Sequence, residues 1–140
     1  MLRTRYYCCM SQNKLIRLPI AQCGLFGVQD DFFEEYLSLD SHFVKNKKST
    51  FFFRAQGASM SPLIMPNDVL IVDRSLAPKS GQICIFTLED KFVCKRYFKS
   101  SQGVVLRSEN RSYKDVLVTE EMNLVSWGVL KGIARDVLNL

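Results

Sequence analysis

The sequence predicts a mainly β domain, built as a curved, barrel-like sheet and preceded by a flexible N-terminal arm. From residue 50 onward, seven short apolar runs follow one another with turn residues between them. The runs cover residues 51–55, 69–73, 83–88, 92–97, 104–107, 116–118 and 125–133. Many short strands at such spacing are typical of antiparallel barrels and sandwiches, whereas strands alternating with helices would indicate a parallel sheet.

Turn-forming residues separate the runs and support the strands in order. These turn segments are residues 66–68, 79–81, 89–90 and 101–103. The segment at 89–90 is short enough to join two strands as a hairpin. In the last run, Gly128 and Gly132 interrupt the apolar pattern, which predicts β-bulges at these positions.

Three parts of the chain differ in pattern. Residues 1–29 have no clear periodicity and are expected to form the arm. Residues 30–49 are expected to hold a short amphipathic helix or turn within 30–43, because aromatic residues recur there at helical spacing, followed by a charged loop. Residues 50–140 are expected to form the β domain that carries any catalytic site.

The length and composition favour one domain of a cytoplasmic protein. The chain has 140 residues, of which 47% are hydrophobic and 24% are charged, as in ordinary globular proteins. No stretch approaches the roughly 18 apolar residues of a membrane span. Arg3 and Arg5 are not followed by an apolar segment, so we expect neither a signal peptide nor a membrane partner.

The cysteines and the single histidine argue against a metal site. The five cysteines have no CxxC spacing, and His42 is the only histidine. We therefore expect no zinc, no other metal and no cofactor. An odd number of cysteines without framework spacing suits a reducing cytosol.

The positive charge is concentrated at the N-terminus. The formal net charge is +5, and residues 1–23 carry four basic residues and no acidic one. Such an arm could contact nucleic acid through its phosphates, but four charges are a weak signal and a solvated tail is the simpler interpretation.

Ser59 and Lys95 are the candidate catalytic residues. Ser59 lies in a glycine-containing turn before a predicted strand, and Lys95 lies inside another predicted strand, 36 residues later. A serine hydroxyl needs a base to become a nucleophile, and no histidine is suitably placed. An exposed lysine is neutral in roughly one of 2,500 molecules at pH 7, but desolvation lowers its pKa. Lys95 has apolar neighbours that would provide this desolvation.

Each of these signals is weak when taken alone. A lysine in a strand is usually solvated, and a serine after glycine is usually a turn or a helix cap. Strand alternation places Lys95 with Val93 and Tyr97 but Arg96 with Phe92 and Cys94, so either cation could face inward. If Ser59 opens a helical turn, the backbone N–H groups near Ser59 and Met60 are candidates for an oxyanion hole.

Several motifs in order make the chain resemble the LexA/UmuD family of self-cleaving SOS-response proteins. They are residues 23–24, 57–60, 68–73, 81, 92–96, 108–113 and 128–129. The resemblance implies a LexA/signal-peptidase-type β fold, with Ser59 as nucleophile and Lys95 as general base. It also implies that the bond between Cys23 and Gly24 is the one that is cut.

The number of residues before the cut site favours the UmuD branch of this family. Only 23 residues precede the bond, too few for the three helices of a helix-turn-helix DNA-binding domain. The resemblance then implies self-cleavage stimulated by the RecA–single-stranded-DNA filament. The trimmed homodimer would act with a UmuC-type polymerase in error-prone translesion synthesis and would contact DNA indirectly.

Three other interpretations remain open at this point. A non-cleaving β-scaffold that binds a polymerase or a recombinase would need neither Ser59 nor Lys95. A signal-peptidase-like protease would need a membrane anchor, and a direct DNA-binding regulator would need a reading helix; the sequence shows no sign of either.

Overall fold

The computed structural model describes residues 10–11, 14–15 and 38–138 of the chain. The chain divides into two compact units: the N-terminal unit, residues 1–45, and the sheet unit, residues 46–140. The bond between Cys23 and Gly24 lies outside the described residues, and so does most of the arm that was expected to be flexible. None of the helices in the described part has the length and hydrophobicity of a membrane span.

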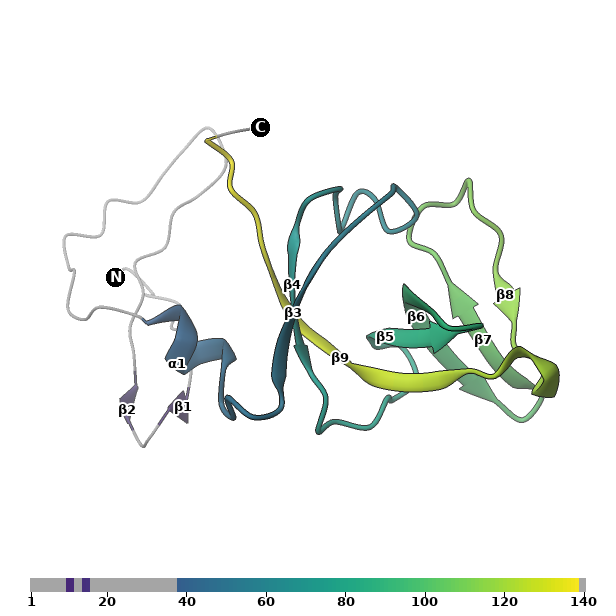
Figure 1. Ribbon diagram of the computed structural model, residues 1–140, viewed down its shortest axis with the longest axis horizontal. Coiled ribbons are helices and arrows are strands. Elements are labelled where there is room, and N and C mark those ends of the chain that lie inside the picture. Colours follow the sequence, from purple (N-terminus) through teal and green to yellow (C-terminus); the bar gives the residue numbers. More distant parts are fainter. Residues whose placement is uncertain (1–9, 12–13, 16–37, 139–140) are drawn as a thin grey trace, which may run out of the picture. The chain divides into compact units, whose positions relative to one another are not determined.

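Short elements make up the described part of the N-terminal unit (Figure 1). Strands β1 (Met10–Ser11) and β2 (Lys14–Leu15) pair antiparallel. Helix α1 (Leu39–Phe43) begins where the Ser38 side chain accepts a hydrogen bond from the Ser41 N–H, which is the usual way to cap a helix. The helix ends at Phe43, the last residue of the segment for which a helix or turn was expected.

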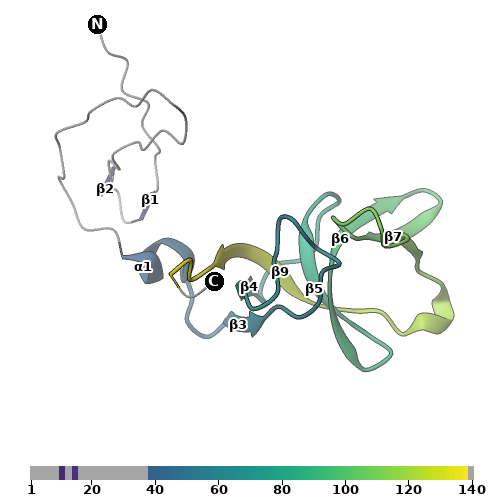
Figure 2. The same ribbon diagram turned by 90° about the horizontal axis from the view of Figure 1, so that it is seen from above.

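A seven-stranded antiparallel sheet forms the sheet unit, which confirms the prediction of a mainly β fold. The sheet has the order β3-β4-β9-β5-β6-β7-β8. Its strands are β3 (Thr50–Arg54), β4 (Val69–Asp73), β5 (Ile83–Leu88), β6 (Lys91–Ser100), β7 (Gly103–Arg107), β8 (Val116–Leu117) and β9 (Val125–Ala134). A 3₁₀ turn, η1 (Glu120–Met122), precedes β9. The strands bend and twist strongly between the two ends of the sheet (Figures 1 and 2).

Strand β9 connects the two halves of the sheet. Its first half pairs with β5 and its second half pairs with β4. The pairing shifts register at Trp127 against β5 and at Lys131 against β4, so a bulge lies next to each of the two glycines of this strand. Bulges increase local twist, and here they allow one long strand to follow both halves (Figure 2).

Gly128 lies where β9 comes close to the end of β4. A Cβ atom at this position would stand 2.8 Å from Val72 Cγ1 and 3.0 Å from the Asp73 carbonyl oxygen. Because the second neighbour is backbone, the strands would have to move apart to admit a methyl group. The position therefore requires glycine for space.

Gly128→Ala is expected to destabilise the sheet unit by about 1–3 kcal/mol, the usual cost of overpacking a filled site. The loss would be measured by urea denaturation. Ser126→Ala, at an exposed position of the same strand, is the matched control and should change stability by less than about 0.5 kcal/mol. Equal stability of the two variants would show that the strands separate freely at Gly128.

Two hydrophobic clusters lie on opposite faces of β5. Ile83 and Ile85 pack in the first cluster, with Met60, Ile64, Leu70 and Val72. Cys84 and Phe86 pack in the second cluster, with Leu106 and Val129. Alternate residues of β5 thus serve different clusters, as the period of two in a strand requires. The curved sheet is buried on both faces in its centre, and the candidate site lies beside the first cluster.

Candidate active site

Ser59 and Lys95 lie within hydrogen-bond distance of each other. Ser59 is in the turn between β3 and β4, and Lys95 is near the middle of β6. The Lys95 Nζ and Ser59 Oγ atoms are 2.9 Å apart. This distance allows direct transfer of a proton from the hydroxyl to a neutral amine.

The turn that carries Ser59 is anchored in the core by its apolar residues. Met60 and Ile64 are 4% and 2% exposed, and the Ile64 N–H donates to the Met60 carbonyl. Residues 59–63 form a turn rather than the regular helical turn for which the sequence left room. Pro62 explains the difference, because it has no N–H to donate to the carbonyl of Ala58, four residues earlier. The Ser61 N–H donates to that carbonyl instead.

Burial of Lys95 lowers the pKa of its amine below the ordinary value of 10.5. The charge of a Cys94 thiolate would oppose this shift. However, burial raises the pKa of Cys94 to about 12, so the thiolate is scarcely populated at neutral pH. Among the described residues, no carboxylate forms an ion pair with Lys95. The amine is therefore easier to deprotonate than that of a surface lysine.

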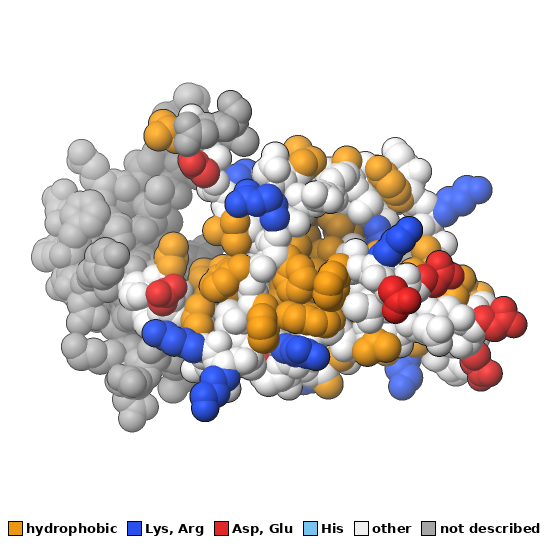
Figure 3. All heavy atoms as spheres, in the orientation of Figure 1, with side chains coloured by type: hydrophobic (Ala, Val, Ile, Leu, Met, Phe, Trp, Pro, Cys, Tyr) orange, Lys and Arg blue, Asp and Glu red, His pale blue; other side chains and the backbone are white. Residues whose placement is uncertain are grey.

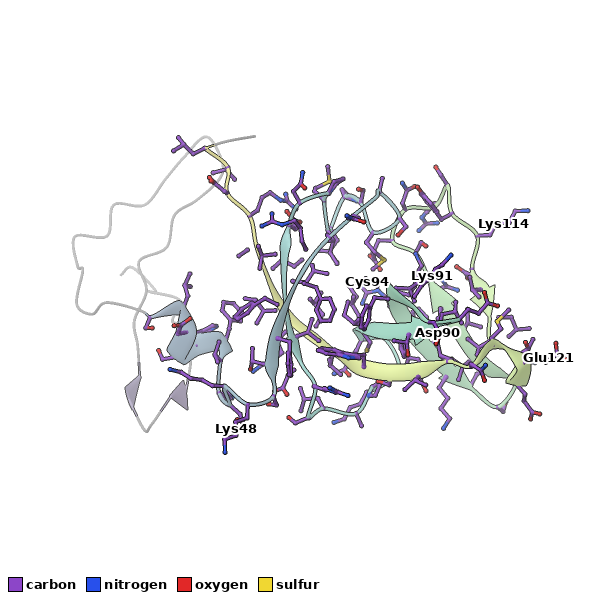
Figure 4. The ribbon with its side chains drawn as sticks, in the orientation of Figure 1. Lys48, Asp90, Lys91, Cys94, Lys114 and Glu121 are labelled. Atoms are coloured by element: carbon purple, nitrogen blue, oxygen red, sulfur yellow. The ribbon has the colours of Figure 1, made fainter. Side chains whose placement is uncertain are left out.

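A cleft of about 430 Å³ opens beside the two side chains. Its walls combine polar and apolar groups and come from β3, β4, β5, β6 and the Ser59 turn. Lining residues include Phe53, Ile64, Leu70, Ile85 and Phe92. Figure 4 shows Cys94, another lining residue, inside the fold, whereas Lys48 and Lys114 project outward. The cleft is large enough for a few residues of an extended peptide.

Aromatic rings form one end of this cleft. Phe53 contacts Trp127 edge-on with ring centres 4.7 Å apart, and it also contacts Phe92 at 5.3 Å. Phe51 packs on the same Trp127 at 4.9 Å. Figure 3 shows hydrophobic side chains gathered on this face, over the region where β3 crosses β9 in Figure 1. Phe92 keeps 58% exposure, so the cleft has an apolar rim open to solvent.

The backbone N–H groups of Ser59 and Met60 donate no hydrogen bond to another described residue. Such free donors beside a nucleophile can bind an oxyanion. No group of three or more histidine, cysteine, aspartate or glutamate side chains within the described ranges could hold a metal ion. Cys23 and Gly24, the expected cut site, lie outside those ranges.

Sequence reasoning did not identify Asn110 as part of this site. Its backbone N–H donates to the Ser59 carbonyl, and its side-chain amide donates to the Ala58 carbonyl, each at 3.0 Å. The only signal in the sequence is that Asn110 falls within residues 108–113, one of the motifs that carry the family resemblance. Its contacts cross a sequence distance of 52 residues, which no local pattern reveals.

Comparison with known proteins identifies the family. The model of the peptidase S24-like family matches residues 16–130, which include the cleft, Ser59 and Lys95. The chain belongs to the peptidase S24-like family. Members of this family are generally self-cleaving serine peptidases, and they include regulators of the SOS response. They typically dimerise and interact with the RecA filament.

Curated relatives of this S24-like chain include proteins named LexA repressor. One from Clostridium kluyveri (strain ATCC 8527) is 28% identical over 131 residues, which cover 90% of this chain and 63% of the relative. Another, from Clostridium botulinum (strain Langeland), is 28% identical over 129 residues, with 89% and 63% covered. The chain thus spans less than two thirds of the length of these relatives.

Proposed function

We propose that this S24-like chain is a serine peptidase that cuts its own bond between Cys23 and Gly24, with Ser59 as nucleophile and Lys95 as general base. The observation that carries the proposal is the 2.9 Å approach of Lys95 Nζ to Ser59 Oγ beside a cleft. The lowered pKa of Lys95 supports the same role, because only the neutral amine can accept a proton.

The proposed reaction has two stages. Neutral Lys95 takes the proton from the Ser59 hydroxyl, and Oγ bonds to the carbonyl carbon of Cys23. The carbonyl oxygen becomes an oxyanion that the N–H groups of Ser59 and Met60 would bind. Lys95 then gives its proton to the nitrogen of Gly24, and the C–N bond breaks. A water molecule, deprotonated by Lys95, hydrolyses the ester and restores Ser59.

The tether between substrate and enzyme makes a modest catalyst sufficient. The cut site and the dyad belong to the same chain, so the substrate is present at a high effective concentration. Gly24 has no side chain, which allows the backbone of the leaving segment to pass close to the serine. Burial of Lys95 beside the cleft would favour the neutral form of its amine, which is the form that accepts the proton.

The finer proposal is that the trimmed chain is an accessory subunit of an error-prone translesion polymerase, as in the UmuD branch. Membership of the S24-like family is compatible with it, because the family includes regulators of the SOS response. We propose a homodimer in the cytoplasm, cleavage stimulated by the RecA–single-stranded-DNA filament, and a UmuC-type polymerase as the partner of the trimmed form. Co-purification of the segment from Gly24 onward with such a polymerase would test this step.

A non-cleaving accessory module is the second candidate function. The exposed aromatic rim of the cleft favours it, since Phe92 is 58% exposed and could dock a partner without any chemistry. Incubation with an activated recombinase filament, followed by mass spectrometry, separates the two functions. A chain that binds the filament and stays intact would favour the scaffold.

The rate of uninduced self-cleavage is expected to rise about tenfold for each pH unit from pH 7, and to level off at the pKa of Lys95, below 10.5. The rate rises with pH because a higher pH increases the neutral fraction of the Lys95 amine, which is the form that accepts the proton. Purified chain would be incubated from pH 7 to 10 and the products followed by gel. Lys91→Ala, at an exposed position of the same strand, should leave the profile unchanged. A flat or falling rate would exclude a lysine base.

A further inference from the structure

The loop between β7 and β8 contacts both elements that carry the dyad. From this loop, Asn110 hydrogen-bonds to the Ser59 turn through its backbone and its side chain. The preceding residue, Glu109, forms an ion pair with Arg96, the neighbour of Lys95 on β6. Arg96 also donates to the Gly81 carbonyl, which holds it in place. The loop therefore links the nucleophile turn to the strand of the base.

The two carbonyls that Asn110 holds belong to the two peptide groups on either side of Ser59. The Ala58 carbonyl shares a peptide plane with the Ser59 N–H, and the Ser59 carbonyl shares one with the Met60 N–H. Both peptides are trans, since the cis bond of this turn is Ser61–Pro62. In a trans peptide the N–H and C=O point in opposite directions. Both N–H groups therefore point away from Asn110.

We propose that Asn110 is a positioning residue that aims the Ser59 and Met60 N–H groups at the oxyanion. This inference rests on the proposed function, because it concerns the same reaction. By holding both carbonyls from behind, Asn110 prevents either peptide plane from rotating. The two donors are thus set before the charge develops, which is how an oxyanion hole lowers the barrier.

Asparagine is the residue type that this position needs. Its Nδ2 donates to the Ala58 carbonyl, while its Oδ1 accepts from the Ser112 N–H at 3.0 Å. The second bond fixes the orientation of the amide, so that a donor faces the nucleophile turn. Aspartate would keep the bond to Ser112 but would present an acceptor to the carbonyl. Alanine would lose both side-chain bonds.

The test compares Asn110→Asp and Asn110→Ala with wild type and with Arg111→Ala, a matched control at an exposed neighbouring position. Rates of self-cleavage would be measured from pH 7 to 10, and thermal unfolding would be recorded for each chain. Both Asn110 variants are expected to cut about 10- to 100-fold more slowly on the high-pH plateau, the scale of a misaimed oxyanion donor. Arg111→Ala should match wild type.

The pH profile distinguishes positioning from a loss of structure. If Asn110 acts through the N–H groups, Asn110→Ala lowers the plateau and leaves the inflection at the same pH, because the surroundings of Lys95 are unchanged. The proposal would be overturned if Asn110→Ala cut more slowly only in proportion to its loss of thermal stability, while Asn110→Asp, which keeps the bond to Ser112, cut at the wild-type rate. A wild-type rate in both variants would overturn it too. A wild-type chain that never cuts would overturn the proposed function itself, and the positioning role with it.

Discussion

Ser59→Ala and Lys95→Ala are each expected to abolish release of residues 1–23. Removing either the nucleophile or the base of a catalytic unit typically costs a factor of about 10⁴–10⁶ in rate, and removing both costs little more. Ser59→Ala leaves no oxygen to attack the carbonyl. Lys95→Ala leaves the hydroxyl with a pKa far above the working pH and no acceptor for its proton.

Both variants should remain folded, because neither residue fills the core. Ser59 is only partly buried, and Lys95 is an amine whose burial disfavours its charged form. Intact-mass measurement at pH 10 would follow the cut, and circular dichroism would follow the fold. Ser61→Ala, two residues from the nucleophile, is the control and should still be cut. Release of residues 1–23 from either dyad variant would show that another group does the chemistry.

Phe86→Ala is expected to have the largest effect on stability, about 3–5 kcal/mol. Phe86 is 1% exposed and lies in the second hydrophobic cluster, where its ring packs against Tyr97 at 5.8 Å. Its removal would leave a cavity that the strands of a closely paired sheet cannot collapse to fill. Since β5 also carries Ile85, which lines the cleft, loosening this strand would disturb the active site as well.

Urea denaturation of the sheet unit in the full chain measures this loss. The midpoint of thermal unfolding should fall by more than about 10 °C. Phe52→Ala removes the same ring from a position that is 59% exposed, and it should cost less than about 1 kcal/mol. If the two variants lose equal stability, the second cluster is not the centre of the core.

The strands could be predicted from the sequence because local patterns determine them. The expected bounds of β4 and β5 agree with the structure residue by residue. Both are continuous apolar runs that start after turn residues, as expected of strands buried on both faces. The expected bulges in β9 also occur, one residue away from each glycine.

The direction of Lys95 could not be predicted, and the reason is the curvature of the sheet. Alternation shows which residues share a face of a strand. It shows which of the two faces is buried only when the other face is solvated. In β6, Cys94 packs against the first cluster, while Val93 and Tyr97 pack against the second. Both faces are therefore apolar in part, and the sequence pattern is compatible with Lys95 or Arg96 in the site.

The link through Asn110 was beyond prediction for a different reason. A loop residue that hydrogen-bonds to backbone carbonyls can have almost any neighbours in sequence, so no periodicity marks it. The absence of a regular helix at Ser59 also depends on one local detail, the missing N–H of Pro62, which a count of residues between strands does not include.

The most direct test of the central claim is to identify the new N-terminus after self-cleavage. Wild-type chain would be incubated at pH 10, where more Lys95 is neutral, and the shorter product would be analysed by N-terminal sequencing and intact mass. We predict a single product that begins at Gly24, formed by wild type and absent in Ser59→Ala. A product that begins elsewhere, or the same product from Ser59→Ala, would contradict the claim that Ser59 attacks the carbonyl of Cys23.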